Sequence, residues 1–194
     1  MKSKYSNKQK LQRLTTASVL AALSIVLMVT VRFPIFPATP FYEMEFADVP
    51  ILICSWILGP VYALVSLLVV CVIQTFSVSA ASGIIGFLMH FLSSGLLIII
   101  LSLFKLKIKD CTGVKGVILR VVSAIVGVLA VILVMIPMNI WLTSEFMGLP
   151  ASEFFKMYLV YCVGFNAIKA GANVLLYNLI SPHLAKAYKK LFKI

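Results

Sequence analysis

The sequence predicts an all-α integral membrane protein, a single domain of residues 1–194 with six transmembrane helices and both termini in the cytoplasm. Three observations lead to this class. Hydrophobic residues make up 62% of the chain and charged residues 12%, and the mean hydropathy is +1.08, well above the values of soluble domains. Long apolar runs alternate with short polar segments. Basic residues concentrate on alternate segments, as they do in the cytoplasmic loops of membrane proteins.

The basic residues predict which side of the membrane each segment faces. Of the 17 Lys and Arg residues, five lie in residues 1–13, five in residues 105–120 and four after residue 185. Apart from Asp110, the acidic residues lie in the other connections: Glu43, Glu45, Asp48, Glu145 and Glu153. Because cytoplasmic loops carry the Lys and Arg excess, residues 1–13 are expected to form a cytoplasmic head and residues 32–46 an extracellular loop.

The apolar runs set the expected elements. About 20 apolar residues cross about 30 Å of hydrocarbon. Helices are therefore expected over residues 14–31, 47–58, 60–76, 82–104, 114–142 and 158–177, with a basic tail after the last. Six helices place every basic segment on one side, whereas five would place the termini on opposite sides.

Three features define the boundaries of the first helices. Arg32 follows the first run where a signal peptide would need a small-residue cleavage site, so a retained helix is expected. The next segment contains three prolines, which predict an ordered, non-helical loop. Gly59-Pro60 marks a turn within the apolar residues 48–76. It divides them into two helices, of which the first is short for a complete crossing.

Several function classes are excluded. The net charge of +11 flanks apolar runs, where it faces anionic lipid headgroups, so nucleic-acid binding is not expected. No Gly-rich phosphate loop indicates ATP hydrolysis by this chain. The two histidines, His90 and His183, have no carboxylate at ligand spacing, and no paired catalytic groups lie within the helices. The cysteines are expected to be reduced and unpaired. We therefore expect neither an enzyme nor a bound metal or cofactor.

Lys169 is the strongest functional signal. It is the basic residue deep within an expected helix, where a charge costs roughly 2.5–3.5 kcal/mol on insertion scales. At about 100° per residue, Asn166, Lys169, Asn173 and Tyr177 share one face of that helix. This polar stripe predicts either a ligand-binding cavity or a buried network that joins helices.

Further polar and aromatic groups are expected at the same outer level. Asn139 follows Pro137, which frees backbone carbonyls, and Gln74 lies at the end of the third helix. Phe41 and Tyr42 lie in the loop before the second helix, where they would either stack on a flat ligand or sit among headgroups. Such a cavity suits a neutral planar or amphipathic small molecule.

Other residues in these segments are given structural roles. Glu43 and Glu45 are expected to be solvated, and Asp48 is expected to cap the second helix. Ala17 and Ala21, with Ala22 beside them, are small residues that allow a close helix approach in lipid.

The chain resembles the substrate-binding S components of energy-coupling factor (ECF) vitamin transporters, and within them the riboflavin type. The resemblance covers nearly the whole chain. It is carried by these segments in order: Ala17-x-x-x-Ala21, Phe33-Pro34-x-Phe36-Pro37, Phe41 through Asp48-Val49-Pro50, Leu58-Gly59-Pro60, residues 78–86 (VSAASGIIG), Pro137-Met138-Asn139 and residues 165–171 (FNAIKAG).

The resemblance implies a multi-pass protein of the bacterial cell membrane that captures riboflavin from outside. It would dock through the helix 1 alanines onto a transmembrane scaffold protein, driven by two cytoplasmic ATPase subunits. Asn139, Asn166 and Lys169 would contact the flavin ring system, and the loop before the second helix would close the site. Met89-His90 departs from the riboflavin pattern, in which Met-Asn is expected.

Three hypotheses follow. The first is a vitamin-binding subunit, with another B vitamin or a pyrimidine-like precursor as an alternative to riboflavin. The second is a self-sufficient secondary carrier, which would couple to H⁺ or Na⁺ through intramembrane carboxylates that the expected spans do not contain. The third is a structural membrane protein in which the polar stripe only packs.

Overall fold

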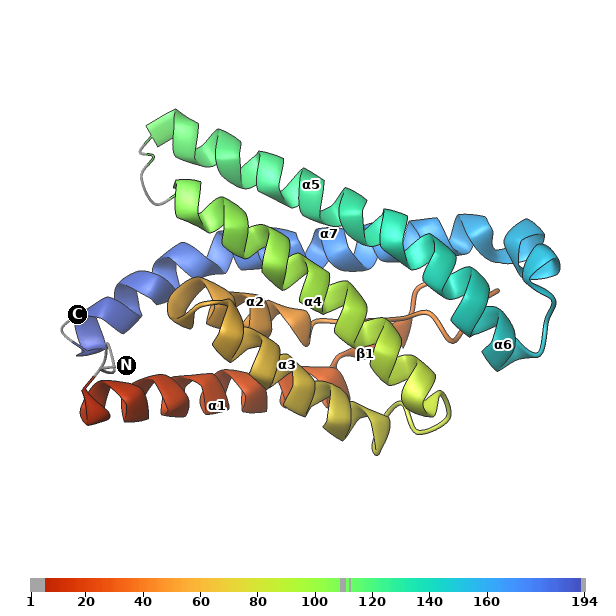
Figure 1. The fold of residues 1–194 in the computed structure, drawn as a ribbon, viewed down its shortest axis with the longest axis horizontal. Helices are drawn as coiled ribbons and strands as arrows, with labels where there is room; N and C mark the ends of the chain where they lie inside the picture. Colours follow the sequence, from red (N-terminus) through yellow and green to blue (C-terminus); the bar gives the residue numbers. More distant parts are fainter. Residues whose placement is uncertain (1–5, 109–110, 112, 193–194) are drawn as a thin grey trace, which may run out of the picture.

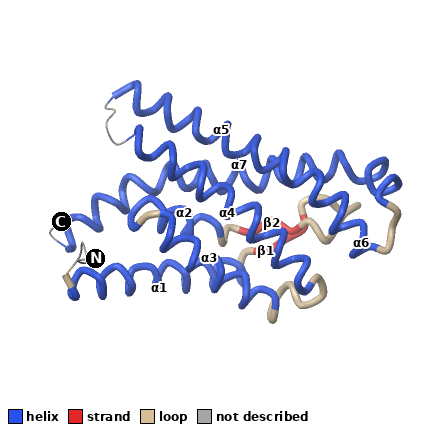
Figure 2. Tube along the Cα trace, in the orientation of Figure 1, coloured by secondary structure: helices blue, strands red, loops and turns tan. Residues whose placement is uncertain are grey.

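The computed structural model describes residues 6–192 except 109, 110 and 112. It is nearly all helical, with one two-stranded hairpin (Figures 1 and 2). In chain order the elements are α1 (Asn7–Thr30), β1 (Arg32–Pro34), β2 (Glu43–Glu45), α2 (Asp48–Leu58), α3 (Pro60–Thr75), α4 (Gly83–Ile108), α5 (Gly113–Met138), the π-helical turn η1 (Asn139–Thr143), α6 (Ser144–Met147) and α7 (Ala151–Phe192).

Among the described residues, four helical segments are long and apolar enough to cross a membrane. They are α1, α4, the segment Gly113–Met147 that joins α5 to α6, and α7. The two remaining apolar helices, α2 and α3, are shorter, with 11 and 16 residues. The fold class is therefore that of a polytopic α-helical membrane protein. Six complete crossings and the orientation in the membrane stay predictions.

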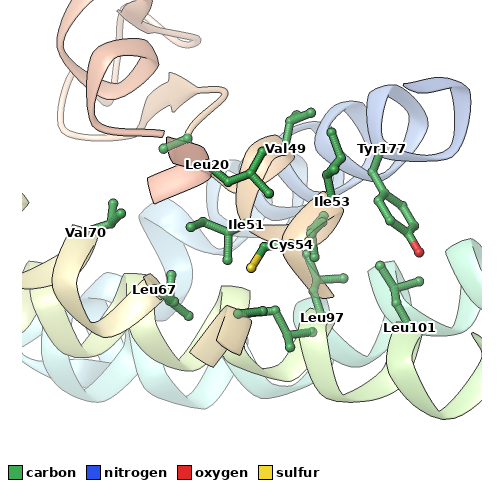
Figure 3. Close-up of a cluster of buried hydrophobic side chains, with 14 of the residues drawn as sticks. Leu20, Val49, Ile51, Ile53, Cys54, Leu67, Val70, Leu97, Leu101 and Tyr177 are labelled. Carbon is green, nitrogen blue, oxygen red and sulfur yellow. The ribbon is translucent and has the colours of Figure 1, made fainter. Parts of the chain in front are cut away.

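The short helix α2 forms the centre of the bundle. It packs against α1, α3, α4 and α7. Most of its side chains are buried because nearly every residue from Asp48 to Ser55 faces a neighbouring helix. Figure 3 shows Ile51 and Cys54 of α2 among Leu67, Leu97 and Leu101, which come from α3 and α4. In lipid, close packing of this kind holds helices together, since apolar burial alone gives no preference over lipid tails.

Local sequence signals explain the helix boundaries. Ser6 and Gln9 form a capping box at the start of α1. Gly59 has a φ of +107°, which a glycine adopts without strain, and Pro60 then opens α3 at a position that needs no N–H. The expected division of residues 48–76 into two helices at this corner is confirmed.

Several expected boundaries were wrong. Helix α1 begins at Asn7, so the second half of the basic head is helical, while residues 1–5 lie outside the described residues. Helix α7 runs unbroken for 42 residues and includes both the expected loop before residue 158 and most of the basic tail. Lys, Ala and Leu are strong helix formers, so this tail continues the helix beyond the apolar run.

The expected loop of residues 32–46 contains an antiparallel hairpin. Strand β1 pairs with β2 in the register Arg32 to Glu45 and Pro34 to Glu43. Three-residue strands are too short to give an alternating pattern in the sequence, so the loop was expected to be ordered without strands. In Figure 2 the hairpin lies toward the end of the bundle opposite the start of α1 and the end of α7.

Candidate functional site

A cavity of about 140 Å³ lies between the hairpin and the adjoining ends of the helices. Its walls come from the hairpin and the loop between its strands, the end of α3, the start of α4, the end of α5 with η1, and the middle of α7. The lining residues are Arg32, Phe41, Tyr42, Glu43, Glu45, Gln74, Ser79, Ser82, Ile85, Gly86, Met89, His90, Ser93, Met135, Asn139, Thr143, Phe146, Phe165, Asn166 and Lys169. The lining therefore combines charged and polar side chains with aromatic rings.

Lys169 joins α7 to the hairpin. Its Nζ donates to Glu45 Oε1 at 2.8 Å, and the Glu45 residue is 2% exposed. Asn173 secures the same strand, because its Nδ2 donates to the backbone carbonyl of Glu45 at 3.1 Å. The expectation that Glu45 is solvated was wrong. A lysine within an apolar helix needs a counter-ion or a polar cavity, and here it has both.

Glu45 is held ionised by its surroundings. It belongs to β2, outside the helices. Burial by itself raises the pKa of this carboxyl, but the positive charges of Lys169 and His90 outweigh burial and hold the pKa below its usual value. The Glu45–Lys169 contact is therefore an ion pair at neutral pH.

His90 lies at the centre of a second buried group. Its Nε2 is 3.0 Å from Asp48 Oδ1, and its Nδ1 contacts Gln74 Oε1. Ser94 also donates to Asp48 Oδ1, at 2.5 Å. Asp48 was expected to cap α2 with its carboxylate. That expectation was wrong, because this oxygen bonds to two residues of α4 and so ties the start of α2 to that helix.

The third polar group lies at the hairpin edge of the cavity. Arg32 Nε donates to Glu43 Oε2 at 2.6 Å, and its Nη2 donates to Ser79 Oγ at 3.1 Å. Gln74 Nε2 donates to the same Ser79 oxygen at 3.1 Å. Hydrogen bonds thus run continuously from Glu43 to His90 along one wall.

Aromatic rings form another part of the lining, the aromatic wall. The Tyr42 ring stacks on Phe165 with 4.7 Å between centroids and 17° between planes, and it contacts Phe41 at 4.7 Å. The Tyr42 hydroxyl donates to Asn139 Oδ1 at 2.7 Å, and Thr143 donates to the same oxygen at 3.0 Å. Flat side chains beside a side-chain amide are typical of sites for planar heterocycles.

The π-helical turn explains how Asn139 reaches this wall. Pro137 has no N–H to donate, and the ladder of α5 widens immediately after it into η1. Asn139 is the first residue of that turn and is 1% exposed. Its Nδ2 donates to Met135 O at 2.7 Å, which holds the side chain inward. The expected regular helix to residue 142 was wrong at this point.

Six of the seven residues expected to contact a ligand line the cavity: Phe41, Tyr42, Gln74, Asn139, Asn166 and Lys169. The seventh, Asn173, is fully buried and supports Glu45 instead. Arg32, Glu45 and His90 also line the cavity, and none of them was expected there. One sequence signal could have indicated that Glu45 is buried. Glu45 and Asp48 flank the apolar pair Phe46-Ala47, directly before an apolar helix.

The alanines of α1 have a different position from the one expected. Ala17 and Ala21 are buried in the protein's own core, so in this structure they are inaccessible to a partner. Ala22 is exposed. The expected docking role therefore stays a prediction for Ala22 alone, and the other two alanines allow α1 to pack closely within the bundle.

The chain is a polytopic helical bundle whose cavity combines amides, aromatic rings and paired charges, a lining typical of small-molecule sites. Among the described residues, no group of three or more His, Cys, Asp or Glu side chains could hold a metal ion. The family model for the substrate-specific component of ECF transporters matches residues 12–181, and the chain belongs to this family. It is thus a substrate-specific membrane subunit of an ECF transporter.

The fold is also similar to a solved structure. The match is to a chain described under "Structure and mechanism of the S component of a bacterial ECF transporter", with a TM-score of 0.70 and 22% sequence identity. It covers 93% of this chain and 99% of the other. No curated protein matches the sequence. At this identity the likeness supports the shared fold.

Proposed function

We propose that the protein captures a neutral, flat vitamin in this cavity, with riboflavin as the first candidate, and passes it to energy-coupling partners for import. The proposed partners are a transmembrane scaffold protein and two cytoplasmic ATPase subunits, and the proposed location is a bacterial plasma membrane. The observation that carries the proposal is the combination of the Phe41, Tyr42 and Phe165 rings with the Asn139 and Asn166 amides in one cavity. Rings bind a planar ligand by stacking, and amides select its hydrogen-bonding edge.

Met89-His90 replaces the Met-Asn of the riboflavin pattern, so a ligand other than riboflavin is also considered. His90 lines the cavity and contacts Asp48 and Gln74, so its ring takes space and hydrogen-bonding capacity that a smaller amide would leave to the ligand. Another B vitamin or a pyrimidine-like precursor is the alternative ligand.

Titration of the purified protein tests the proposal. Riboflavin is added in detergent while flavin fluorescence and the fluorescence of Trp56 and Trp141 are followed. Saturable quenching at nanomolar ligand is the expected result. A well-folded sample that shows no quenching would remove riboflavin and direct the titration to the other B vitamins.

A secondary carrier is the second candidate, and one observation favours it. The expected spans contain no carboxylates in their interiors, which disfavours a carrier, yet the structure buries Glu45 and Asp48 beside His90 and Lys169. Such clusters occur in proton-coupled carriers. Reconstitution in liposomes decides between the two: the protein alone is expected to bind vitamin without accumulating it, and accumulation driven by a pH gradient would establish a carrier.

A further inference from the structure

The charged side chains that line the cavity are paired with one another or with a close neighbour. Arg32 contacts Glu43, Lys169 contacts Glu45 at 2.8 Å, and His90 lies 3.0 Å from the Asp48 carboxylate. A site for a charged ligand needs an opposite charge that is not already compensated, since desolvating the ligand charge is costly. The pairing therefore favours a ligand that is uncharged along this wall.

The Arg32–Glu43 pair differs from the other two in its position. The Glu43 side chain is 33% exposed, against 3% for Glu45 and 4% for Asp48. Glu43 therefore lies where the cavity meets the surface, and the other pairs lie deeper. A ligand whose ring system occupies the aromatic wall would bring a polar tail to this edge.

The Arg32–Glu43 edge offers a hydrogen-bond donor and an acceptor side by side. Within the described chain, the buried Nη1 of Arg32 has no hydrogen-bond partner, while Nε and Nη2 are used by Glu43 and Ser79. Glu43 accepts through Oε2. Ser79 and Ser82 add hydroxyl groups to the same edge of the lining. A hydroxyl group can accept from a guanidinium and donate to a carboxylate at once.

We propose that Glu43 determines specificity: the edge formed by Arg32, Glu43, Ser79 and Ser82 receives the hydroxyl groups of a neutral ligand, and the Glu43 carboxylate rejects forms that carry a phosphate or carboxylate there. The inference rests on the proposed vitamin capture. Arg32 alone would attract an anion, but an anion bound to it would lie beside Glu43. Like charges placed together reduce affinity and so provide discrimination.

Competing affinities of riboflavin and riboflavin 5′-phosphate test this inference. The two ligands share ring and tail and differ in the terminal phosphate. Dissociation constants are measured at fixed salt for the wild type, Glu43→Gln and Arg32→Gln, with Glu153→Gln as a control that removes an exposed acid outside the cavity. Size-exclusion profiles confirm that each variant is folded.

The two cavity variants are expected to shift the preference in opposite directions. The wild type binds riboflavin at least about tenfold more tightly than its phosphate. Glu43→Gln leaves Arg32 uncompensated and reduces this ratio by about tenfold or more, chiefly by strengthening phosphate binding. Arg32→Gln increases the ratio, and Glu153→Gln leaves it unchanged.

Four outcomes would overturn the inference. Equal binding of both ligands by the wild type, or an unchanged ratio in Glu43→Gln, contradicts the role of Glu43 while leaving vitamin capture intact. Equal shifts in Glu43→Gln and Glu153→Gln would show a general effect of surface charge. If neither flavin binds the folded wild type, the riboflavin proposal fails, and this inference fails with it.

Discussion

At the scale of single residues, Lys169 has the clearest role. An amine in an apolar helix is expensive unless it meets an anion or water. Glu45 supplies the anion at 2.8 Å, and the cavity supplies polar neighbours. The side chain therefore serves two purposes: it holds the hairpin against α7, and it presents its remaining N–H donors to the cavity.

Replacement of Lys169 by Met is expected to abolish ligand binding and to destabilise the protein. The change leaves the buried Glu45 carboxylate without its cation, and breaking a buried pair in this way costs about 3–5 kcal/mol. Thermal unfolding in detergent and ligand titration are the measurements. The double variant Glu45→Gln with Lys169→Met is expected to recover most of the stability but not the binding. Wild-type affinity in the folded double variant would remove Lys169 from the site.

Tyr42 allows a milder test of the aromatic wall. Tyr42→Phe keeps the stacking on Phe165 but removes the hydrogen bond to Asn139 Oδ1, which still accepts from Thr143. The expected loss of stability is about 0.5–1.5 kcal/mol, which corresponds to a fall in Tm of a few degrees. Tyr161→Phe, which keeps its edge contact with Phe36, is the control. Equal melting temperatures of Tyr42→Phe and Tyr161→Phe would show that the Tyr42 hydroxyl contributes nothing to stability.

At the scale of elements, the site depends on how the hairpin loop packs against α7. Phe36 lies over Gly164 of that helix, where an added Cβ would come within 3.3 Å of the Phe36 ring. Phe36 also contacts Tyr161 one turn earlier. The absence of a side chain at position 164 thus lets the loop approach the helix closely.

Gly164→Ala is expected to displace Phe36 and weaken ligand binding several-fold, because a methyl group inserted into a packed contact costs about 1–3 kcal/mol. Gly171→Ala on the same helix is the matched control. A Cβ there meets nothing within 4 Å, so this variant should keep its affinity and gain helix stability. Affinities and melting temperatures of both variants are compared. Equal affinities in the two variants would show that the loop position does not affect binding.

Sequence reasoning identified the elements better than the contacts between them. The prediction of a turn at Gly59-Pro60 was correct because the signal for it lies in two adjacent residues. The widening of α5 at Asn139 was missed, since Pro137 predicts a disturbance of the helix without its form. The hairpin was missed because its strands have three residues each.

At the scale of the whole molecule, side-chain pairing was the least predictable feature. The seven ligand-contact residues were chosen from periodicity and residue type, and six of them line the cavity. The charge pairs in and beside the cavity were not predicted, because Glu45 and Lys169 are 124 residues apart and Asp48 and His90 are 42 apart. Contacts at such separations depend on the packing of several helices, for which a single sequence gives no pattern.

The expected topology has a test that uses the native cysteines. Cys54, Cys71 and Cys162 are buried, and only Cys111, between α4 and α5, is partly exposed among the four. Because basic residues predict that the connection between α4 and α5 is cytoplasmic, a membrane-impermeant maleimide should label the protein only after cells are permeabilised. Cys111→Ser should abolish that labelling. Labelling of intact cells that is lost in Cys111→Ser would reverse the predicted orientation.

The ion pair between Glu45 and Lys169 also has a consequence for biogenesis. The ribosome makes the hairpin early and α7 last, so Glu45 exists for 124 residues of synthesis before its partner does. During that interval no cation from α7 is present to neutralise the Glu45 carboxylate. Insertion of Lys169 into the membrane costs roughly 2.5–3.5 kcal/mol as long as the lysine is not paired with Glu45. The wall that contains the Glu45–Lys169 ion pair is therefore complete only after α7 has been inserted.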